Sequence, residues 1–341
     1  MSHIEINNTY NLGIQDLRVA YKPFSHPKYF EYFKQALSTV WRVETVDMNS
    51  DILNYQTGSI EEQEIIQGIL KGFTILETRI GDYWSDIVPK IFPKHEIVAA
   101  CRAFAFFEVI HSQAYSHLSD CLGLNDYNAF LDDPTTKTKI EYFVEHPNKL
   151  VSLAVFSGAG EGVALFSSFA VLLSLSRNGR YKGLAQIISW SISDEMTHSD
   201  MGCALFKDLV LEKGITEEEE ELIYEGFRTV LDNEFNFINQ IFNNRLLPFI
   251  NSEDLKQYMY LRANNRLEAL GLTPIFSFDK RAYNISNWFL NEVIGQSSHD
   301  FFAQAINGDN YTSLLKQDFN NFNYSNVDFN WANQKHSTFV K

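Results

Sequence analysis

Apolar residues recur every three or four positions through most of the chain, and this spacing is typical of amphipathic α-helices. Apolar runs are nowhere joined by Asn-Gly or Asp-Gly, and strict alternation of apolar and polar residues is nowhere sustained, so strands are not predicted. The pattern therefore predicts an all-α helical bundle. The expected helices span Pro27–Val40, Thr57–Asp86, Glu96–Leu122, Val151–Ser176 and Tyr181–Leu211.

The two ends of the chain depart from this pattern. The first residues, to about position 26, are polar and aromatic, and we expect an extended arm there. After Gly308 the chain is rich in Asn, Asp, Phe, Tyr and Ser and has little apolar periodicity. Such a composition favours a segment that is mobile or that orders only on a partner. We therefore predict one helical domain over residues 1–308 and a flexible tail over 309–341.

A run of acidic residues, Glu217–Glu221, follows Thr216. Threonine is a common N-cap, and carboxylates in a first turn interact favourably with the positive end of the helix dipole. We interpret the run as the solvated start of a further helix and not as a metal site.

The segment Ser152–Leu175 is long and apolar enough to suggest a membrane span. It contains Glu161 near its centre, and a solitary carboxylate at a bilayer midplane is costly. A helix that is apolar on all sides can equally be the central helix of a soluble bundle. We favour this second interpretation, predict no membrane association, and expect a functional role for Glu161.

Charge and cysteine content narrow the classes of function. The 341-residue chain has 43 Asp and Glu against 28 Lys and Arg, a net charge of −15. This balance argues against nucleic-acid binding, which needs a basic surface. The three cysteines, Cys101, Cys121 and Cys203, are too widely spaced for a disulfide framework or a CxxC redox pair. A cytoplasmic, reducing location is therefore expected.

Two Glu-x-x-His pairs carry the candidate chemistry: Glu108 with His111, and Glu195 with His198. Residues i and i+3 share one face of a helix, so each pair can present a carboxylate and an imidazole to the same metal ion. Either pair alone is a weak signal. Both pairs, however, interrupt apolar sequence, where an unpaired charge is costly to bury.

Two further carboxylates, Glu77 and Glu161, also interrupt apolar helices. Four helices would then each carry one buried Glu and two of them would add a His, which is the ligand set of a bundle that holds two metal ions. Oxygen and nitrogen ligands without thiolate suit iron or manganese better than zinc. The four carboxylates would also balance the charge of two divalent cations.

Each of these residues also has an interpretation that involves no metal. Glu77 lies close to Arg79 and could be a surface charge, Glu161 could be a core carboxylate paired elsewhere, and either histidine could be a satisfied core residue. Zinc-protease chemistry is not indicated, because each segment supplies one His rather than the two of HExxH. The Gly158–Gly162 run follows no predicted strand and lacks the Lys-Ser/Thr of a phosphate loop.

Tyr115 lies four residues after His111, one further turn along the same helix face. It is either a core tyrosine or a redox-active phenol beside an oxidising metal pair.

With these residues in place, the sequence resembles the class I ribonucleotide reductase small (beta) subunit family, from roughly Ala20 to Tyr311. The motifs lie in the order that the family uses. They are a Trp in VWRVETVD, a first Glu, an E-x-x-H-S-x-x-Y motif, a Glu followed by F-x-x-F-A, a D-E-x-x-H motif, and Phe-Phe before a Tyr. In this chain these motifs contain Trp41, Glu77, Glu108–Tyr115, Glu161, Asp194–His198, Phe301–Phe302 and Tyr311.

The resemblance implies a homodimeric, ferritin-like all-α subunit with a dinuclear centre of iron or manganese (Fe/Fe, Mn/Fe or Mn/Mn). Such a subunit delivers a one-electron oxidant to a cysteine of a separate catalytic (alpha) subunit, which reduces ribonucleotides to deoxyribonucleotides. Asp194 would hydrogen-bond a ligand histidine and Trp41, Tyr311 would relay the radical, and the tail would dock on the alpha subunit. The ligands implied are Glu77, Glu108, His111, Glu161, Glu195 and His198.

Two departures from the family pattern bear on these expectations. Glu77 occupies a position where the most familiar members have Asp, and a Glu there is associated with manganese-containing sites. Tyr115 is nevertheless retained, so its role as a radical carrier depends on which metals bind. The tail lacks the short acidic end of the family, and Tyr324 and Trp331 are second candidates for the relay.

Three other functions fit part of the pattern. A ferritin-like ligand-binding oxidase or monooxygenase would share the six ligands but would not need Trp41, Tyr311 or a docking tail. An iron-storage protein of the ferritin type would need no phenol beside the metals and is usually much shorter. A purely structural bundle with coincidental buried acids is the third.

Overall fold

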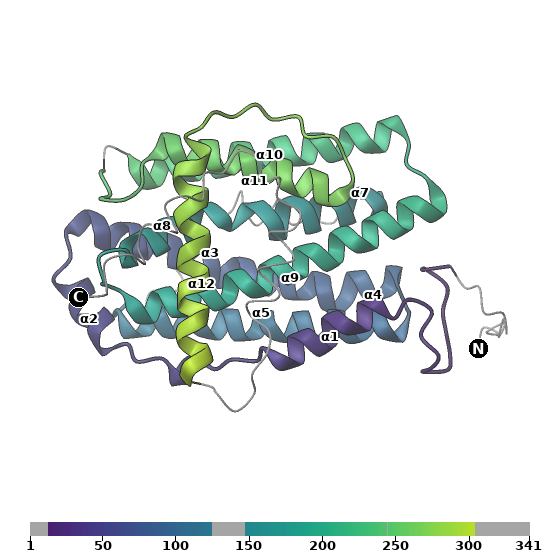
Figure 1. The fold of residues 1–341 in the computed structure, drawn as a ribbon, viewed down its shortest axis with the longest axis horizontal. Helices are drawn as coiled ribbons and strands as arrows, with labels where there is room; N and C mark the ends of the chain where they lie inside the picture. Colours follow the sequence, from purple (N-terminus) through teal and green to yellow (C-terminus); the bar gives the residue numbers. More distant parts are fainter. Residues whose placement is uncertain (1–12, 125–146, 244, 304–341) are drawn as a thin grey trace, which may run out of the picture.

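The computed structural model describes residues 13–124, 147–243 and 245–303 (Figure 1). Every regular element in these residues is helical, so the predicted all-α bundle is confirmed. The elements are α1 (Lys28–Ser38), the 3₁₀ turn η1 (Val43–Thr45), α2 (Asn49–Gln56), α3 (Ile60–Asp82), the π turn η2 (Tyr83–Ile87), α4 (Val88–Ile91), α5 (His95–Cys121), α7 (Lys149–Ala154), the π segment η4 (Val155–Ala164), α8 (Phe166–Ser176), α9 (Lys182–Lys213), α10 (Glu217–Phe242), α11 (Ser252–Leu270) and α12 (Ala282–Ala303).

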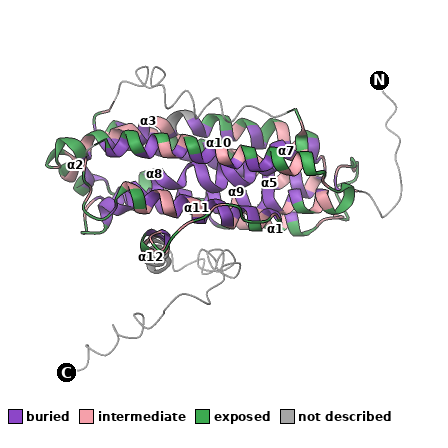
Figure 2. Ribbon diagram, turned by 90° about the horizontal axis from the view of Figure 1, so that it is seen from above, coloured by how far each residue is buried: buried purple, intermediate pink, exposed green. Residues whose placement is uncertain are grey.

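Four long elements make the middle of the bundle and run along the long axis of the molecule (Figure 1). They are α3, α5, the continuous α7–η4–α8 segment and α9; α3 packs along α5, and α9 packs along η4. Figure 2 shows that buried residues gather where these elements face one another. The helices α10 and α11 pack on η4 from outside, so the segment that contains Glu161 is enclosed.

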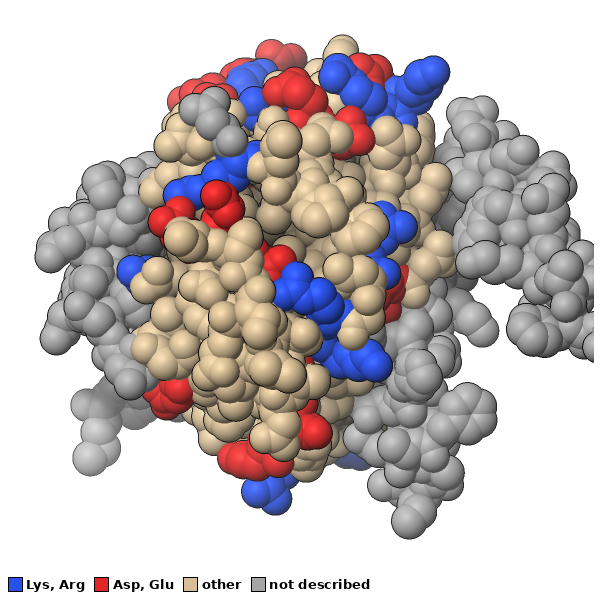
Figure 3. Space-filling model, turned by 90° about the vertical axis from the view of Figure 1, so that its left-hand side faces the viewer, with Lys and Arg blue, Asp and Glu red and all other residues tan. Residues whose placement is uncertain are grey.

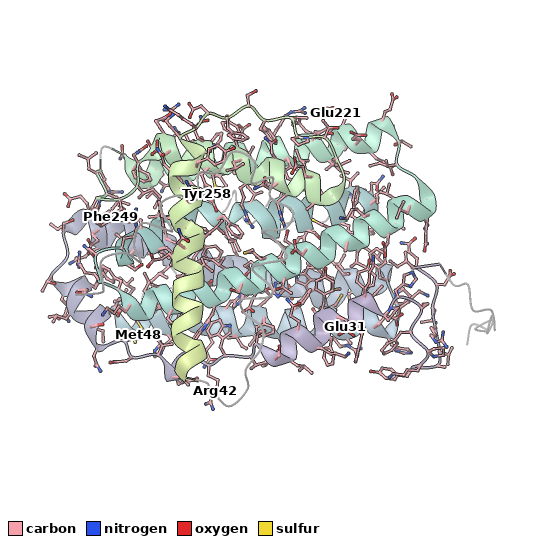
Figure 4. All side chains as sticks on the ribbon, in the orientation of Figure 1. Glu31, Arg42, Met48, Glu221, Phe249 and Tyr258 are labelled. Carbon is pink, nitrogen blue, oxygen red and sulfur yellow. The ribbon has the colours of Figure 1, made fainter. Side chains whose placement is uncertain are left out.

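The last described helix, α12, crosses the others nearly at right angles (Figure 1). It packs on α11 and α9. Tyr258 of α11 lies beneath it in Figure 4, with its ring centroid 5.7 Å from that of Phe289. The crossing helix therefore fastens α11 to the central bundle.

Hydrogen bonds set the helix starts. Thr216 Oγ1 accepts from the Glu219 amide and the Glu219 carboxylate accepts from the Thr216 amide, so the solvated helix start is confirmed as a capping box. The start of α9 is capped by a different element. Asp51 of α2 accepts from the amides of Gly183 and Leu184 at 3.1 and 2.8 Å. This carboxylate fastens α2 to the N-terminus of the helix that contains two candidate ligands.

Several helix boundaries differ from the prediction. Thr57 ends the unpredicted helix α2, and α3 begins at Ile60 because the Ser59 side chain accepts from its first turn. Tyr181 has φ of 47°, outside the helical region, so α9 begins one residue later than predicted. The sequence pattern also does not predict α11 and α12. In α11 the buried positions include Arg262 and Arg266, which obscure the apolar period.

The segment predicted as one continuous helix, Val151–Ser176, changes its winding. It begins as α7, continues as the π segment η4 and returns to α-helix in α8. Two glycines of η4 allow close packing at this point. A Cβ on Gly158 would lie 2.8 Å from Phe227 of α10, and one on Gly162 would lie 2.4 Å from the Arg266 side chain of α11.

Two described helices are long and apolar enough to cross a membrane, α5 and α7–η4–α8. In α7–η4–α8, 89% of the most apolar stretch is buried inside the protein, which is the burial of a core helix. The most apolar stretch of α5 is 50% buried, and Phe106 and Val109 are exposed on the outer face of this helix.

Residues 13–27 form turns and bends without regular secondary structure, and residues 1–12 of the predicted arm lie outside the described residues. The Ile14 amide donates to the Glu212 carboxylate at 2.9 and 3.0 Å, and Lys94 Nζ donates to the Asp16 carbonyl at 3.1 Å. These bonds hold the arm against the end of α9 and the start of α5.

Charges of both signs lie side by side at the α2 end of the molecule, with uncharged areas between them (Figure 3). A hydrogen-bonded cluster of three side chains links α3 to the turn before α9. Glu62 of α3 accepts from Arg180 at 2.7 and 2.8 Å and from the Tyr181 hydroxyl at 2.5 Å. Because Arg180 and Tyr181 form the turn between α8 and α9, this group holds that turn against α3.

Candidate metal centre

The structure brings the six predicted ligands together in the middle of the bundle. Each of the four central elements contributes one glutamate, and α5 and α9 each add a histidine one turn after theirs. All six side chains are buried, and Glu77 is fully so, which rules out the alternative of a surface charge there. The residues are Glu77 on α3, Glu108 and His111 on α5, Glu161 on η4, and Glu195 and His198 on α9.

The six side chains form two overlapping groups of four that share Glu108 and Glu195. In each group the ligand atoms all lie within 4.8 Å of one another. His111 Nδ1 lies 3.0 Å from Glu195 Oε1 and 3.3 Å from Glu108 Oε2. His198 Nδ1 lies 2.9 Å from Glu108 Oε1 and 3.5 Å from Glu195 Oε2. Glu77 completes the first group and Glu161 the second, so the geometry suits two adjacent cations with two shared carboxylates.

Apart from the imidazole–carboxylate contacts just given, the polar atoms that face the centre of this cluster have no hydrogen bond of ordinary geometry among the described residues. They are both carboxylate oxygens of Glu77, Glu108 and Glu195, Oε2 of Glu161, and Nδ1 of both histidines. Buried polar groups are nearly always hydrogen-bonded, and buried carboxylates are paired or bound to metal. Such a concentration of unsatisfied oxygen and nitrogen atoms fits a site for hard or borderline divalent cations.

Burial and mutual repulsion shift the pKa values of the four glutamates. Burial, reinforced by the charges of Glu195 and Glu108, raises the pKa of both Glu77 and Glu161 well above the usual value. Burial opposes the ionisation of Glu108 and Glu195 as well, but contacts with His111 and His198, and for Glu195 first the contact with Glu161, lower the pKa of each. The shared carboxylates are therefore the ones that stay ionised without metal.

The histidines respond in the opposite direction. Although burial disfavours a charged imidazole, contacts with Glu108 and Glu195 raise the pKa of His198 to about 9. Burial opposes the charge on His111 as well, but contacts with Asp194 and three glutamates raise its pKa well above 6.5. In the absence of metal these two protons compensate part of the buried negative charge.

Asp194 connects the cluster to Trp41. Its Oδ2 accepts from Trp41 Nε1 at 2.8 Å and lies 3.1 Å from His111 Nε2. The rings of Trp41 and His111 stack, with centroids 5.9 Å apart and planes 23° apart. Both bonds expected for Asp194 are thus present, and the carboxylate orients the imidazole whose other nitrogen faces the cluster.

Tyr115 is fully buried beside the first group of ligands. Its ring centroid lies 6.3 Å from that of His111 and 4.7 Å from that of Phe73. Its hydroxyl has no hydrogen bond of ordinary geometry within the described residues. Burial and the charge of Glu77 raise the pKa of Tyr115 well above its usual value, so the phenol keeps its proton.

Two tryptophans near the site are not predicted from the sequence. Trp84, in the π turn η2, donates from Nε1 to Glu161 Oε1. Trp190, on α9, has its ring centroid 5.1 Å from that of Trp41. Trp190 could have been suspected because it lies one helical turn before Asp194. Trp84 offers no comparable signal, since its partner is distant in the sequence.

Part of the predicted site lies outside the described residues. This applies to Tyr311, to the second relay candidates Tyr324 and Trp331, and to the whole tail over 309–341.

The chain is similar to known proteins over most of its length. The family model for "Ribonucleotide reductase, small chain" matches residues 18–283, a range that contains all six candidate ligands. A probable ribonucleoside-diphosphate reductase small subunit of Invertebrate iridescent virus 3 is 28% identical, over 84% of this chain and 82% of the relative. The ribonucleoside-diphosphate reductase subunit beta of Halalkalibacterium halodurans is 24% identical, over 81% of this chain and 84% of the relative. Among solved structures, the dimanganese(II) NrdF of Streptococcus sanguinis has a TM-score of 0.72 at 19% identity, covering 81% of this chain and 99% of that one.

Proposed function

The chain belongs to the ribonucleotide reductase small-chain family, and we propose that its six buried carboxylate and imidazole groups hold a dinuclear metal centre. As a member it is the small subunit of a ribonucleoside-diphosphate reductase, an oxidoreductase. The observation that carries the proposal is the set of unpartnered buried atoms, which face one another in two groups with two shared glutamates.

Each ligand has a distinct place in this proposal. Glu77 and His111 would hold one ion and Glu161 and His198 the other, and Glu108 and Glu195, which belong to both groups, would be available to each ion. When bound and oxidised by an oxygen species, such a metal pair would supply a one-electron oxidant. The four carboxylates match the charge of two divalent ions, so the loaded site can be buried without net charge.

Trp41 and Asp194 connect this oxidant to the rest of the enzyme. Loss of an electron makes an indole N–H strongly acidic, and Asp194 Oδ2 already accepts the hydrogen bond from Trp41 Nε1. Burial raises the pKa of Asp194, which favours its taking that proton. Because the site is enclosed, water does not compete with Asp194 for this proton. The oxidising equivalent then continues to a cysteine of the catalytic subunit.

The metal is iron or manganese in this proposal, as Fe/Fe, Mn/Fe or Mn/Mn. Oxygen and nitrogen donors bind both metals. The Streptococcus sanguinis structure, which has the same fold, is that of a dimanganese(II) protein. In the present chain Glu77 supplies a glutamate where the most familiar members have Asp, and this substitution is associated with manganese.

A catalytic alpha subunit and a second copy of this chain are the proposed partners. The tail over 309–341 docks on the alpha subunit, and Tyr311 relays the radical between the subunits. The second copy packs on the outer face of α5, where the side chains of Phe106 and Val109 are 51% and 64% exposed beside the polar residues Arg102 and Gln113. The location is the reducing cytoplasm.

The relay is tested by Trp41→Phe, which keeps an aromatic ring and removes the N–H. Assayed with the alpha subunit, this variant should retain both metals and lose nucleotide reduction by about 100-fold or more. Trp288→Phe is the matched control on α12, remote from the ligands, and should behave as wild type. Unchanged turnover in Trp41→Phe would remove Trp41 from the path.

Truncation after Gly308 separates the reductase from the oxidase or monooxygenase alternative. Removal of the tail should abolish reductase activity with the alpha subunit and leave metal loading intact. Full activity without the tail, or loss of metal on truncation, would contradict the docking role.

Tyr115→Phe distinguishes the two carriers of the oxidising equivalent. The variant should be inactive if the phenol carries the radical, as expected with two iron ions. It should be tolerated if a manganese-containing pair retains the oxidising equivalent. The measurement is turnover with the alpha subunit, together with metal content.

A further inference from the structure

One candidate ligand lies on a backbone whose helical winding differs from that of the other five. Glu161 lies in η4, which is π-wound, whereas the others lie on α-helices in the described chain. Where a helix changes from α to π winding, backbone carbonyls at the change lose their usual donors. Buried carbonyls need other partners, so something in the surrounding structure must supply them.

Arg262 of α11 supplies one such partner. Its side chain is buried, and Nε donates to the Gly162 carbonyl at 2.7 Å, one residue after Glu161. Its guanidinium carbon lies 3.5 Å from the ring centroid of Phe166, the first residue of α8. The arginine therefore holds η4 at the point where the winding returns to α-helix.

Ser199 of α9 supplies the second. Its Oγ donates to the Ser157 carbonyl at 2.6 Å, near the start of η4. Arg266 orients this hydroxyl, since Nη1 lies 3.3 Å from Ser199 Oγ and 2.8 Å from Asp200 Oδ1. Gly162 lacks a Cβ at the place where the Arg266 side chain passes. The two carbonyl contacts lie on either side of Glu161 in the sequence.

We propose that Arg262 and Ser199 are positioning residues that hold η4 in its π winding and thereby aim Glu161 at Glu195 and His198. Neither residue belongs to the two groups of candidate ligands. The inference rests on the proposed function, because it assigns these contacts to the second of the two metal positions. It predicts that their loss weakens one position and spares the other.

The test is a titration of metal-free protein with Mn²⁺, with free Mn²⁺ followed by electron paramagnetic resonance. Wild type should bind two Mn²⁺ per chain. In Arg262→Gln the affinity for one Mn²⁺ should fall about tenfold or more, which is the usual cost of losing a group that orients a ligand, and the other should change little. Arg262→Lys can still donate to the Gly162 carbonyl and should recover part of the loss.

Arg228→Gln is the matched control. Arg228 is a more exposed arginine of α10 that pairs with Glu221 and Glu225 on its own helix, so this variant should bind two Mn²⁺ as wild type does. Ser199→Ala provides a second variant that preserves the arginine and should again weaken one Mn²⁺. Its control is Ser174→Ala, because Ser174 is a buried serine that donates to the Val171 carbonyl of its own helix.

Hydrogen exchange of the metal-free proteins gives a second readout. Amides of residues 155–164 should exchange faster in Arg262→Gln than in wild type, and amides of α3 and α5 should not. The inference is overturned if wild type binds two Mn²⁺ and both Arg262→Gln and Ser199→Ala bind them with unchanged affinities. It is also overturned if both variants lose the two ions equally. Wild type that binds two metal ions neither as Mn²⁺ nor, in a parallel anaerobic titration, as Fe²⁺ would instead overturn the proposed function.

Discussion

The two halves of the metal centre contain the same ligand types in different surroundings. His111 is held by Asp194 and stacks on Trp41, so the first half is joined by polar contacts to a tryptophan that is itself nearly buried. His198 instead packs against aromatic rings, with Phe104 at 4.2 Å and Trp84 at 6.1 Å between centroids. We therefore assign the exit of the oxidising equivalent to the first half.

The backbones differ in the same way. Glu77, Glu108 and His111 lie on α-helices that pack directly on each other. Glu161 depends on a π segment held by contacts from α9 and α11. π segments are rare in proteins and are often found at functional sites. The second half is thus the one whose geometry depends most on neighbouring elements.

The largest effect on metal content is expected from a substitution that affects both halves of the metal centre. Glu195→Ala deletes a ligand shared by both groups and should lose most bound metal. Glu77→Ala deletes a ligand of the first group alone and should weaken one metal ion while the other stays. Mn²⁺ titration of both variants checks this. Equal losses in the two variants would contradict the assignment of shared and unshared carboxylates.

The metal affinity of both halves should depend on pH. A histidine binds metal only as the neutral imidazole. Since contacts with Glu108 and Glu195, acting against burial, raise the pKa of His198 to about 9, a proton must leave this ring before metal binds below that pH. Metal affinity should therefore rise as pH increases from 6 to 9, by up to about tenfold per unit for each proton released. Mn²⁺ titrations across this range test the prediction, and a pH-independent affinity would contradict it.

The smallest expected effect lies outside both halves. Thr216→Ala breaks the capping box of α10 and should lower the free energy of unfolding by about 1 kcal/mol. Neither group of ligands contains this residue, so Mn²⁺ binding should not change. Urea denaturation measures the first quantity. A loss of metal with this modest destabilisation would show that the halves respond to general stability rather than to their own contacts.

The ligand cluster was predictable from the sequence because its members break a strong pattern. A carboxylate in an apolar helix is costly unless it is paired, so Glu77, Glu108, Glu161 and Glu195 stand out. The i, i+3 spacing then adds the two histidines. The all-α fold follows from the same periodicity, and the capping box follows from residues adjacent in the chain.

The features that were not predictable depend on contacts between distant segments. The π winding of η4 leaves no periodic trace, because that segment is apolar on all sides. Asp51 caps α9 from another helix, and nothing near it in the sequence indicates this. Arg262 belongs to α11, where buried charges hide the apolar face. Local patterns identify the ligands, and tertiary packing decides how they are held.

We propose above that this chain binds two redox-capable metal ions in one buried site. The most direct test is elemental analysis of the purified chain, with iron and manganese reported per polypeptide. We predict two metal ions per chain: two iron ions would make Tyr115 the radical carrier, and manganese, alone or with iron, would connect Glu77 to metal choice. Zinc alone, or no metal after supplementation with both ions, would contradict a dinuclear iron or manganese site.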